Sequence, residues 1–384
     1  MTDTTGLKNR GKTKADTEDR RKAAEEFTGT KLDSISRYGF EPELASKNIE
    51  NMIGTVQIPL GYAGPVAIHG EYADGEYLIP LATTEGALVA SISRGMSVIN
   101  QSGGVRTAVL ADAMTRAPVL KVNGIKHSKE VIAWIDSHKK EIDEAVAGTT
   151  SHGKLIDIEP FPNGNSLYLR FSFSTGDAMG MNMATLASEA VCRLIEKETG
   201  ATMVSVSGNM CSDKKPAAIN MISGRGKTVL AEATIPRDIV ESKLHASPES
   251  IVDTNIRKNL VGSSMSGTLG ANAHAANMVA ALYIATGQDP AQVVGGSMTI
   301  TTCEANDDGL YICVRMPTVE VGTVGGGTSL PCQSEALKMI DCQGSGKAKK
   351  LAEIVASTVL AGELSTLAAQ AAGQLGQAHK ALGR

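Results

Sequence analysis

Residues 166 to 199 carry the clearest pattern of local structure in the chain. Ser166 to Ser174 alternates apolar and polar side chains, which is typical of a half-buried strand. Met181 to Thr199 has the spacing of a helix, and a glycine-containing loop at residues 175 to 180 joins the two segments. A helix N-terminus that follows such a loop can bind phosphate through its free N–H groups. We therefore expect a nucleotide-binding unit in this region.

A second helix is predicted between residues 86 and 100, where apolar positions recur at helical spacing. Thr83 or Thr84 is a suitable N-cap, and the pair Gly103-Gly104 is a good helix stop. This interpretation places Glu85 in the first turn, where a carboxylate is normally a favourable partner of the helix dipole.

Two further helical segments are lined with small residues. One runs from Gly267 to Thr286 and ends at Gly287, and the other covers residues 347 to 382 with breaks at its glycines, among them Gly362. Aromatic residues make up only 3% of the chain, so aliphatic side chains must fill its cores. Glycine allows close backbone approach. Such a composition suits an enzyme built from closely packed helices.

Composition excludes several classes of protein. A length of 384 residues indicates two or three domains. A formal net charge of -4 gives no general attraction to nucleic acid or anionic membranes, so neither is an expected partner. The six cysteines show neither C-x-x-C spacing nor clustering with histidine, which indicates a reducing compartment and no metal site. The longest apolar stretch, near residues 275 to 285, is shorter than the roughly 20 residues of a membrane-spanning helix.

Five loops of small residues expose either one carboxylate or bare backbone. The most informative loop is residues 207 to 216, which sets Lys214 and Lys215 beside Asp213 in a segment too small and polar to be core. Two adjacent cations are suited to meet an anion or an oxyanion. The other loops cover residues 82–86, 177–183, 287–289 and 322–328. Together the five loops look like one dispersed active site.

With these loops in this order, the chain resembles the class I 3-hydroxy-3-methylglutaryl-CoA (HMG-CoA) reductases, the NADPH-dependent enzymes that make mevalonate. The resemblance covers most of the chain. It begins at Glu50-Asn51-Met52-Ile53-Gly54, which is similar to the family's dimerisation motif, and extends to Ala371-Ala372-Gly373 and His379. Several independent motifs in the family's order are far more specific than a single glycine pattern.

The resemblance implies an α+β fold with a large domain around a central helix. A small nucleotide-binding α/β domain of ferredoxin-like type would be inserted at residues 117–206. The large HMG-CoA-binding domain would then comprise residues 49–116 and 207–384, and residues 1–48 would form a helical N-terminal cap. The family is homo-oligomeric with active sites between subunits, so we expect at least a homodimer. The low charge, the missing anchor and the short tail predict a soluble form of archaeal or prokaryotic type, and the cysteine pattern predicts a cytoplasmic one.

The resemblance also implies four catalytic residues. Lys214 would stabilise the oxyanion that forms at the substrate carbonyl in each hydride step, and Asp289 would hold that lysine charged and oriented. Glu85, held among these two in a dry pocket, would donate a proton as the intermediate aldehyde is reduced. His379, on a hinged terminal segment, would protonate the CoA thiolate and swing away during cofactor exchange.

Further residues are implied to bind the substrate and the cofactor NADPH. Arg116, Lys215 and Lys258 are candidates for the free carboxylate of the substrate. The other candidate substrate contacts are Ser207, Asp213 and Asn277, with Arg94 and His274 along the path of CoA. The loops that would approach the cofactor pyrophosphate through backbone N–H groups contain Asp177, Met179, Gly180, Met181, Asn182, Gly325, Gly326 and Gly327.

Three alternatives remain open from the residues alone. The basic pair that many class I members use for the cofactor 2′-phosphate is not clearly reproduced near residues 150–154, so an NAD-dependent, degradative reductase is the first. Cys211 lies beside the cationic pair, so a cysteine-dependent acyl-CoA transferase is the second, and it would need a partnered base. A non-catalytic oligomeric scaffold is the third, although it leaves the four candidate catalytic residues without a reason.

Overall fold

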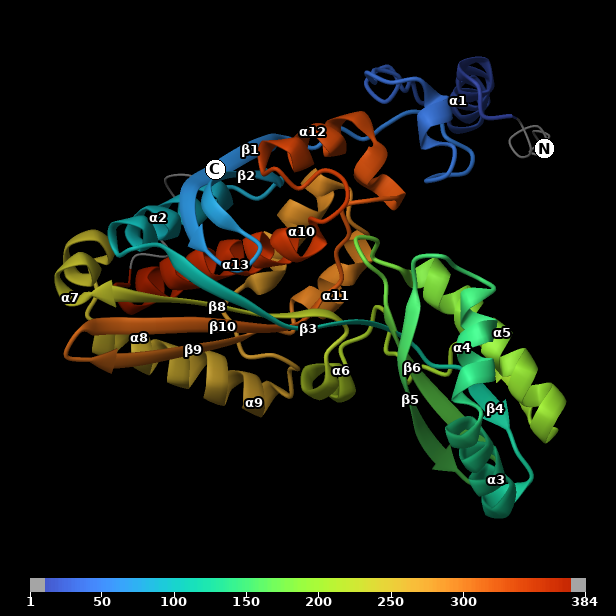
Figure 1. Ribbon diagram of the computed structural model, residues 1–384. Helices are drawn as coiled ribbons and strands as arrows, with labels where there is room; N and C mark the ends of the chain where they lie inside the picture. Colours follow the sequence, from blue (N-terminus) through green and yellow to red (C-terminus); the bar gives the residue numbers. More distant parts are fainter. Residues whose placement is uncertain (1–10, 374–384) are drawn as a thin grey trace.

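The computed structural model describes residues 11 to 373, and its strands form one connected system (Figure 1). The strands are β1 (Leu60–His69), β2 (Asp74–Ala82), β3 (Val105–Arg116), β4 (Val119–Lys121), β5 (Lys154–Asn163), β6 (Ser166–Ser174), β7 (Thr202–Ser205), β8 (Gly226–Pro236), β9 (Ile300–Asn306) and β10 (Gly309–Val319). Their order is β7–β4–β6–β3–β8–β10–β9, with β1 pairing with β2 and β3, and β5 with β6.

Strand β3 connects a large domain to a small one. Its residues 106–113 pair antiparallel with β8 in the large domain, and its residues 114–116 pair antiparallel with β6 in the small domain. Each domain has its own cluster of buried apolar side chains. One long strand therefore fixes the small domain against the edge of the large one, as Figure 1 shows.

The large domain is built around a central helix, α13 (Ala348–Ala371). Every residue of α13 from 351 to 369 is buried, and the helix packs against α2 (Leu88–Gln101), α10 (Ala275–Thr286) and strand β8. By length and composition α13 could cross a membrane, but protein encloses it on all sides, so it is a core helix. The expectation that the longest apolar segment lies near residues 275 to 285 is therefore wrong.

Two glycines explain how closely the helices pack around α13. A Cβ on Gly95 of α2 would lie 2.0 Å from the carbonyl oxygen of Ala361, so only glycine fits at this crossing. A Cβ on Gly362 would lie 2.6 Å from the sulfur of Met278 on α10. The predicted break at Gly362 is wrong, because this glycine makes room for a neighbouring helix and leaves α13 continuous.

Two helices begin later than their sequence patterns predict. Helix α2 starts at Leu88, because Ala87 has a left-handed backbone with φ of 69°. Glu85 therefore precedes the helix, and the Thr83 hydroxyl accepts a hydrogen bond from the Glu85 N–H at 3.0 Å instead of capping α2. Helix α10 starts at Ala275 rather than Gly267, since Gly267, with φ of 72°, ends the preceding helix α9 (Ser263–Ser266).

The small domain has the ferredoxin-like arrangement that the resemblance implies. Its elements follow the order β4, α3 (Gly124–Ser137), α4 (Lys139–Ala147), β5, β6, α5 (Met181–Thr199) and β7. The antiparallel strands lie in the order β7–β4–β6–β5. The predicted strand at 166–174 and the predicted helix at 181–199 are both confirmed.

The described part of the N-terminal segment, residues 11–48, is helical in part and stands out from the large domain in Figure 1. Helix α1 (Lys14–Thr28) begins with a capping box between Thr13 and Asp16 and ends at Gly29. The remaining short helices are η2 (Pro42–Ala45), α6 (Ala218–Ser223), α7 (Arg237–Ile239), η3 (Val240–Leu244), α8 (Pro248–Thr254), η4 (Asn255–Gly262), η5 (Pro290–Gln292), α11 (Val293–Gly296), η6 (Gly326–Ser329) and α12 (Pro331–Met339).

Candidate active site

The loop at residues 207 to 216 has an unusual backbone. Asn209, Ser212 and Lys214 all have left-handed conformations, with φ of 66°, 48° and 58° respectively. Residues other than glycine adopt this conformation at a cost, and such residues cluster at functional sites. The loop therefore holds Lys214 in a specific, strained position.

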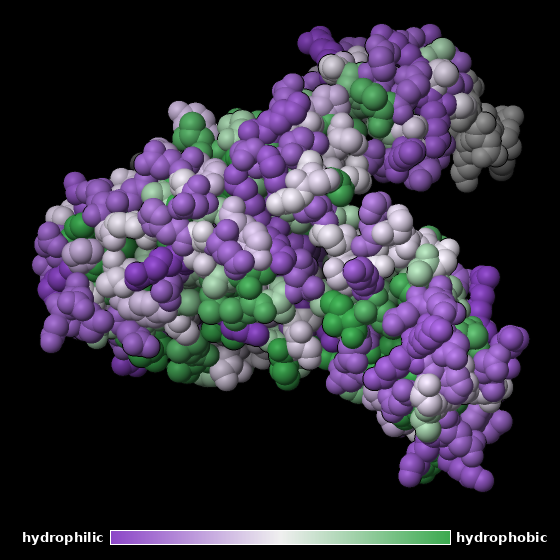
Figure 2. Space-filling view, in the orientation of Figure 1, coloured by the Kyte–Doolittle hydropathy of each residue, from purple (hydrophilic) through white to green (hydrophobic). Residues whose placement is uncertain are grey.

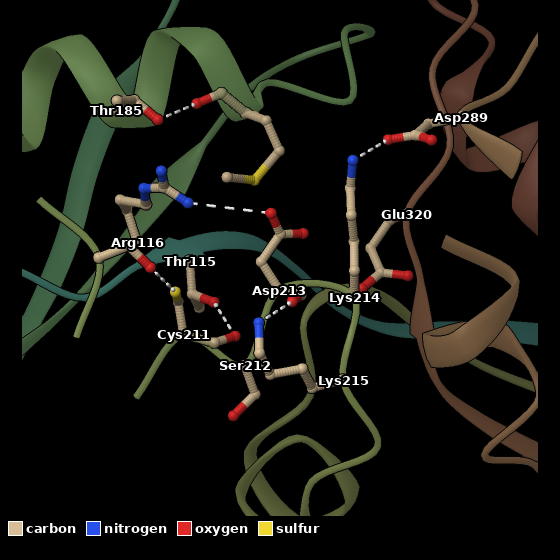
Figure 3. Close-up of polar contacts among 12 residues, drawn as sticks. Thr115, Arg116, Thr185, Cys211, Ser212, Asp213, Lys214, Lys215, Asp289 and Glu320 are labelled. Atoms are coloured by element: carbon tan, nitrogen blue, oxygen red, sulfur yellow. Dashed lines mark hydrogen bonds and ion pairs between the residues drawn. The ribbon is translucent and has the colours of Figure 1, made fainter. Parts of the chain in front are cut away.

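Lys214 forms an ion pair with Asp289. The Lys214 ammonium lies 2.8 Å from an Asp289 carboxylate oxygen, and Figure 3 shows the two side chains extended toward each other. Asp289 follows the C-terminus of α10, where Gly287 ends the helix with φ of 70°. Its other carboxylate oxygen accepts a hydrogen bond from the N–H of Ala291 at 3.0 Å. The predicted pairing of these two loops thus occurs within one chain.

Three side chains lie against the carboxylate of Asp213, and two of them, Arg225 and Gln292, are fully buried. Arg225 and Gln292 both approach one of its carboxylate oxygens at 3.0 Å. Arg116, which Figure 3 shows beside Asp213, lies 3.8 Å from the other oxygen. Arg225 also donates to Glu320 at 2.7 Å, and both of these side chains are almost fully buried. Burial raises the pKa of Glu320 to about 7, although the Arg225 guanidinium opposes this shift.

Ser207 and Cys211 lie on the same loop with their side chains 3.5 Å apart. Burial alone would raise the pKa of the Cys211 thiol, but the Ser207 hydroxyl and the N–H groups of Asp213 and Ala117 outweigh it, so the pKa is lowered. Cys211 is fully buried. Its position does not favour attack on an acyl-CoA, because a nucleophile must reach its substrate.

Lys215 points away from the pair formed by its neighbour. Its side chain is exposed, and its ammonium donates to the backbone carbonyl of Asp213 at 3.2 Å. That contact leaves two further donors on the ammonium for an incoming anion.

Glu85 belongs to a different group of side chains. Asn277 donates to a Glu85 carboxylate oxygen at 3.3 Å and also lies 3.3 Å from the Nδ1 atom of His274. The Nε2 atom of His274 lies 3.1 Å from the carbonyl oxygen of Gly362 and 2.6 Å from the Thr366 hydroxyl, both on α13. The central helix therefore positions this second group.

A buried carboxylate on α13 holds the start of α10 in place. Glu363 accepts hydrogen bonds from the N–H groups of Ala273 and His274 and from the Thr301 hydroxyl, at 2.7 to 2.8 Å. Lys258 of η4 lies near the same carboxylate, and burial lowers the pKa of this lysine although Glu363 opposes the shift. Its ammonium donates to the side chain of Asn259 at 2.9 Å.

Helix α10 separates the two groups. Asn277 lies in its first turn and Asp289 lies just beyond its last residue. A helix rises about 1.5 Å per residue, so the ends of this 12-residue helix are about 18 Å apart. Within one chain, Lys214 and Asp289 come together, but Glu85 does not join them. The expected dry pocket containing all three residues is therefore not formed by a single chain.

Of the remaining predicted site residues, Arg94 contacts the central helix. The Arg94 guanidinium donates to the hydroxyl and the carbonyl oxygen of Ser365 on α13. Burial lowers the pKa of Arg94. His379 lies outside the described residues.

A cleft of about 650 Å³ lies between the small domain and the glycine-rich loop of the large domain. The start of α5 forms one wall, and residues 322 to 328 form the opposite one. Asp289 also lines the cleft, so the cleft reaches the Lys214 pair. Seven of the eight predicted cofactor residues line it: Met179, Gly180, Met181, Asn182, Gly325, Gly326 and Gly327.

The walls of this cleft suit a dinucleotide. Gly325 and Gly326 have φ of 74° and 55°, and open space surrounds the position that a Cβ would take on each. A side chain at either position would project from a strained backbone. Gly180 provides the left-handed N-cap of the 19-residue helix α5, whose first residues line the cleft. Bare backbone and a helix N-terminus are the features that a pyrophosphate needs.

Asp177, the eighth predicted cofactor residue, has a structural contact instead. Its carboxylate accepts hydrogen bonds from the N–H groups of Gly346, Lys347 and Ala348, at the start of α13. Its backbone carbonyl accepts from the N–H of Thr323 at 2.8 Å. Burial would raise the pKa of Asp177, but the three N–H groups outweigh burial and lower it. Asp177 thus connects both walls of the cleft to the central helix.

The sequence interpretation missed three buried charged residues that shape this region, namely Arg225, Glu320 and Glu363. One signal was present at Glu320, which stands between Val319 and Val321 in an apolar strand end. A carboxylate in such a segment is buried and needs a partner.

Comparisons with known proteins agree with this geometry. The family model described as hydroxymethylglutaryl-coenzyme A reductase matches residues 16–384. The 3-hydroxy-3-methylglutaryl-coenzyme A reductase of Pyrococcus abyssi is 55% identical over 377 residues, which cover 96% of this chain and 92% of that protein. The reductase of Haloferax volcanii is 52% identical, with the same coverage of 96% and 92%.

More distant relatives share the sequence or the fold. A reductase of the plant Gossypium hirsutum is 46% identical over 94% of this chain and 59% of its own length. A class II 3-hydroxy-3-methylglutaryl-CoA reductase from Streptococcus pneumoniae, solved with NADPH, superposes with a TM-score of 0.70. The match is 21% identical and covers 91% of this chain and 82% of that one, so it confirms the fold alone. The chain belongs to the hydroxymethylglutaryl-coenzyme A reductase family.

Proposed function

We propose that this protein reduces HMG-CoA to mevalonate and free CoA, with two NADPH and two protons consumed per molecule of substrate. The observation that carries the proposal is the Lys214–Asp289 ion pair on a strained loop at the edge of the dinucleotide cleft. Membership of the reductase family supports it. The reaction serves the synthesis of isoprenoid precursors.

Lys214 performs the central task in this reaction. Each hydride step places negative charge on the oxygen of the reacting carbonyl, and an ammonium group close to that oxygen stabilises the charge. Asp289, at 2.8 Å, orients the ammonium. Asp213, held by Arg225 and Gln292, is placed on the same loop to orient the hydroxyl of the substrate.

Two proton donors complete the chemistry. Glu85, hydrogen-bonded by Asn277, donates a proton during reduction of the aldehyde. His379 protonates the CoA thiolate when the hemithioacetal collapses. The carboxylate of the substrate is bound by cations, for which Arg116, Lys215 and Lys258 are the candidates.

NADPH supplies the hydride when bound in the cleft between the small domain and the loop at residues 322–328. The start of α5 and the glycines at 325–327 would hold its pyrophosphate through backbone N–H groups. Asp177 keeps these two walls in register. The streptococcal structure, which shares this fold, contains NADPH.

The complete active site requires two subunits. Glu85 and the Lys214 pair lie near opposite ends of α10, so a second copy of the chain must bring Glu85 to Lys214. Exposed apolar side chains offer surfaces for such a contact, and Figure 2 shows hydrophobic atoms along the lower edge of the large domain, near α9. These exposed residues include Ile256, Leu260, Val261, Met265 and Leu269. Burial of such an apolar surface is what stabilises obligate dimers.

The chain is of the class I type in this proposal. Its identity to archaeal relatives is 49% to 55% and to a plant relative 46%, against 21% for the class II structure. All six cysteines are free thiols, which fits a reducing cytoplasm. We expect NADPH rather than NADH as the cofactor, because the proposed reaction is biosynthetic.

An assay of cofactor oxidation tests the proposal. HMG-CoA is supplied with NADPH or NADH to the wild type and to Lys214→Ala, with circular dichroism as the check of folding. We expect two NADPH oxidised per CoA released and no turnover by Lys214→Ala. A preference for NADH would indicate the degradative direction, and no turnover with either cofactor would reject the proposed reaction.

A further inference from the structure

Arg225 and Glu320 form a buried pair behind the loop that carries Lys214. Arg225 is 0% exposed and the Glu320 side chain is 1% exposed. Burying two ionised groups is costly unless each has a close partner, and replacing such a pair by apolar residues often leaves a protein as stable or more so. Stability alone is therefore a weak reason for this pair.

The guanidinium of Arg225 is a fork that reaches two carboxylates. Its Nη1 atom donates to Glu320 at 2.7 Å, and its Nη2 atom lies 3.0 Å from Asp213. Glu320 in turn lies against Gly295 of α11, where an added Cβ would come within 2.6 Å of its carboxylate. Arg225 is thus fixed on one side by a tightly packed carboxylate, and its other side is aimed at Asp213.

Gln292 connects the Arg225–Glu320 pair to the segment that carries Asp289, the partner of Lys214. Its amide nitrogen donates to Asp213 at 3.0 Å, and its amide oxygen lies 3.3 Å from Arg225 Nη1. Gln292 is 0% exposed and belongs to η5, the short helix that Asp289 caps. One buried group of three side chains therefore touches both the loop of Lys214 and the helix behind Asp289.

We propose that Arg225 is a positioning residue for substrate binding. Glu320 holds Arg225 in place, and Arg225 in turn fixes the carboxylate of Asp213. This inference rests on the proposed function, because Asp213 is expected to orient the substrate. Arg225 does not touch the substrate in this proposal. It sets the direction of a side chain that does.

A double-mutant cycle tests the proposal. The value of kcat/KM for HMG-CoA at saturating NADPH is measured for the wild type, Arg225→Lys, Asp213→Asn and the double variant. Lysine keeps the charge but cannot reach two carboxylates at once. We expect Arg225→Lys to lower kcat/KM about tenfold, mainly through KM for HMG-CoA, and to have less than about a twofold effect when Asp213 is already Asn. The KM for NADPH is measured as well, because Arg225 Nη2 also lies 2.7 Å from the sulfur of Met181 in the cofactor cleft. It should change less than the KM for HMG-CoA, since the carboxylate of Asp213 faces the substrate in this proposal.

Two further variants separate positioning from packing. Glu320→Gln keeps an acceptor for Arg225 and should retain kcat/KM within about threefold, whereas Glu320→Ala removes the acceptor and should resemble Arg225→Lys. Arg20→Lys is the matched control, because Arg20 is also buried, at 3% exposure, but its guanidinium bonds the backbone of Gly11 and Met52. Its effect should be the same factor with Asp213 present or replaced.

Two results would overturn the proposal. An equal loss from Arg225→Lys in both Asp213 backgrounds would mean that Arg225 only supports the fold. If Asp213→Asn had the same kcat/KM as the wild type, Asp213 would not orient the substrate, and Arg225 could not act through it. Both results require an active wild-type enzyme, so they are distinct from failure of the proposed reaction, in which the wild type itself would not oxidise NADPH.

Discussion

The ammonium of Lys214 lies 2.8 Å from the carboxylate of Asp289, although the two residues come from loops on different parts of the large domain. Lys214 is 44% exposed and Asp289 is 29% exposed in the single chain. A charge that stabilises an oxyanion acts most strongly where water is excluded. The pair is therefore assembled within one chain, where both side chains remain partly open to solvent.

Replacing Asp289 by Asn should remove the charge that orients Lys214 while preserving the size of the side chain. We expect kcat to fall about 100-fold or more, by analogy with the loss of one oxyanion-stabilising group, with little change in the KM for NADPH. Steady-state kinetics provide the measurement. Glu198→Gln is the control, because it breaks an exposed ion pair at 2.9 Å on α5 and should leave kcat unchanged. Equal kcat for Asp289→Asn and the wild type would contradict the assigned role.

Mixed dimers should regain activity that both parent variants lack. Glu85→Gln and Lys214→Ala should each inactivate both sites of a homodimer. In the proposed arrangement, every site takes Glu85 from one subunit and Lys214 from the other. In a mixed dimer, one site then contains two intact residues and the other contains none. A one-to-one mixture after subunit exchange should have about one quarter of wild-type activity, since about half of the dimers are mixed. No recovery in verified mixed dimers would place both residues in the same subunit's site.

Asp177→Asn should destabilise the protein in a pH-dependent manner. The pKa of Asp177 is lowered in the folded protein, so its contribution to stability is complete above the ordinary aspartate pKa of 3.8 and is lost as the pH falls through the folded-state value. At pH 7 we expect a loss of about 1 kcal/mol, typical of a helix-capping carboxylate. Urea denaturation at several pH values measures the difference between variant and wild type. A difference that stays constant into the acid range would show that the charge is not responsible.

Gly95→Ala should be far more damaging than Gly362→Ala, although both glycines lie where helices cross α13. At Gly95 the new methyl group would meet the Ala361 carbonyl at 2.0 Å, and backbone on a buried helix cannot move aside. At Gly362 the neighbour is the flexible side chain of Met278. We expect about 3 kcal/mol of destabilisation for Gly95→Ala and about 1 kcal/mol or less for Gly362→Ala, measured by denaturant unfolding. The reverse order would mean that α2, rather than Met278, is the part that yields.

Local patterns were sufficient for the elements whose signals lie within a few residues. The strand at 166–174 and the helix at 181–199 were predicted with their observed boundaries, because side-chain periodicity and a bounding glycine act locally. The helix starts at Leu88 and Ala275 were missed, since a left-handed Ala87 and a turn at Gly267 depend on how the loops pack. Gly362 was misread as a break for a related reason. A glycine has the same sequence signature whether it ends a helix or admits a neighbour.

The candidate site was likewise predictable in part from the sequence. The residue types of its loops, two cations beside a carboxylate and runs of glycine, already indicated oxyanion and phosphate chemistry. Which of them meet depended on packing over long range: Lys214 joins Asp289, Glu85 joins Asn277, and α10 keeps the two pairs apart. The sequence also did not show that Arg225 and Glu320 would be buried together behind this site. The free energy that fixes a buried charge comes from the groups the fold places around it, and a linear chain does not specify those neighbours.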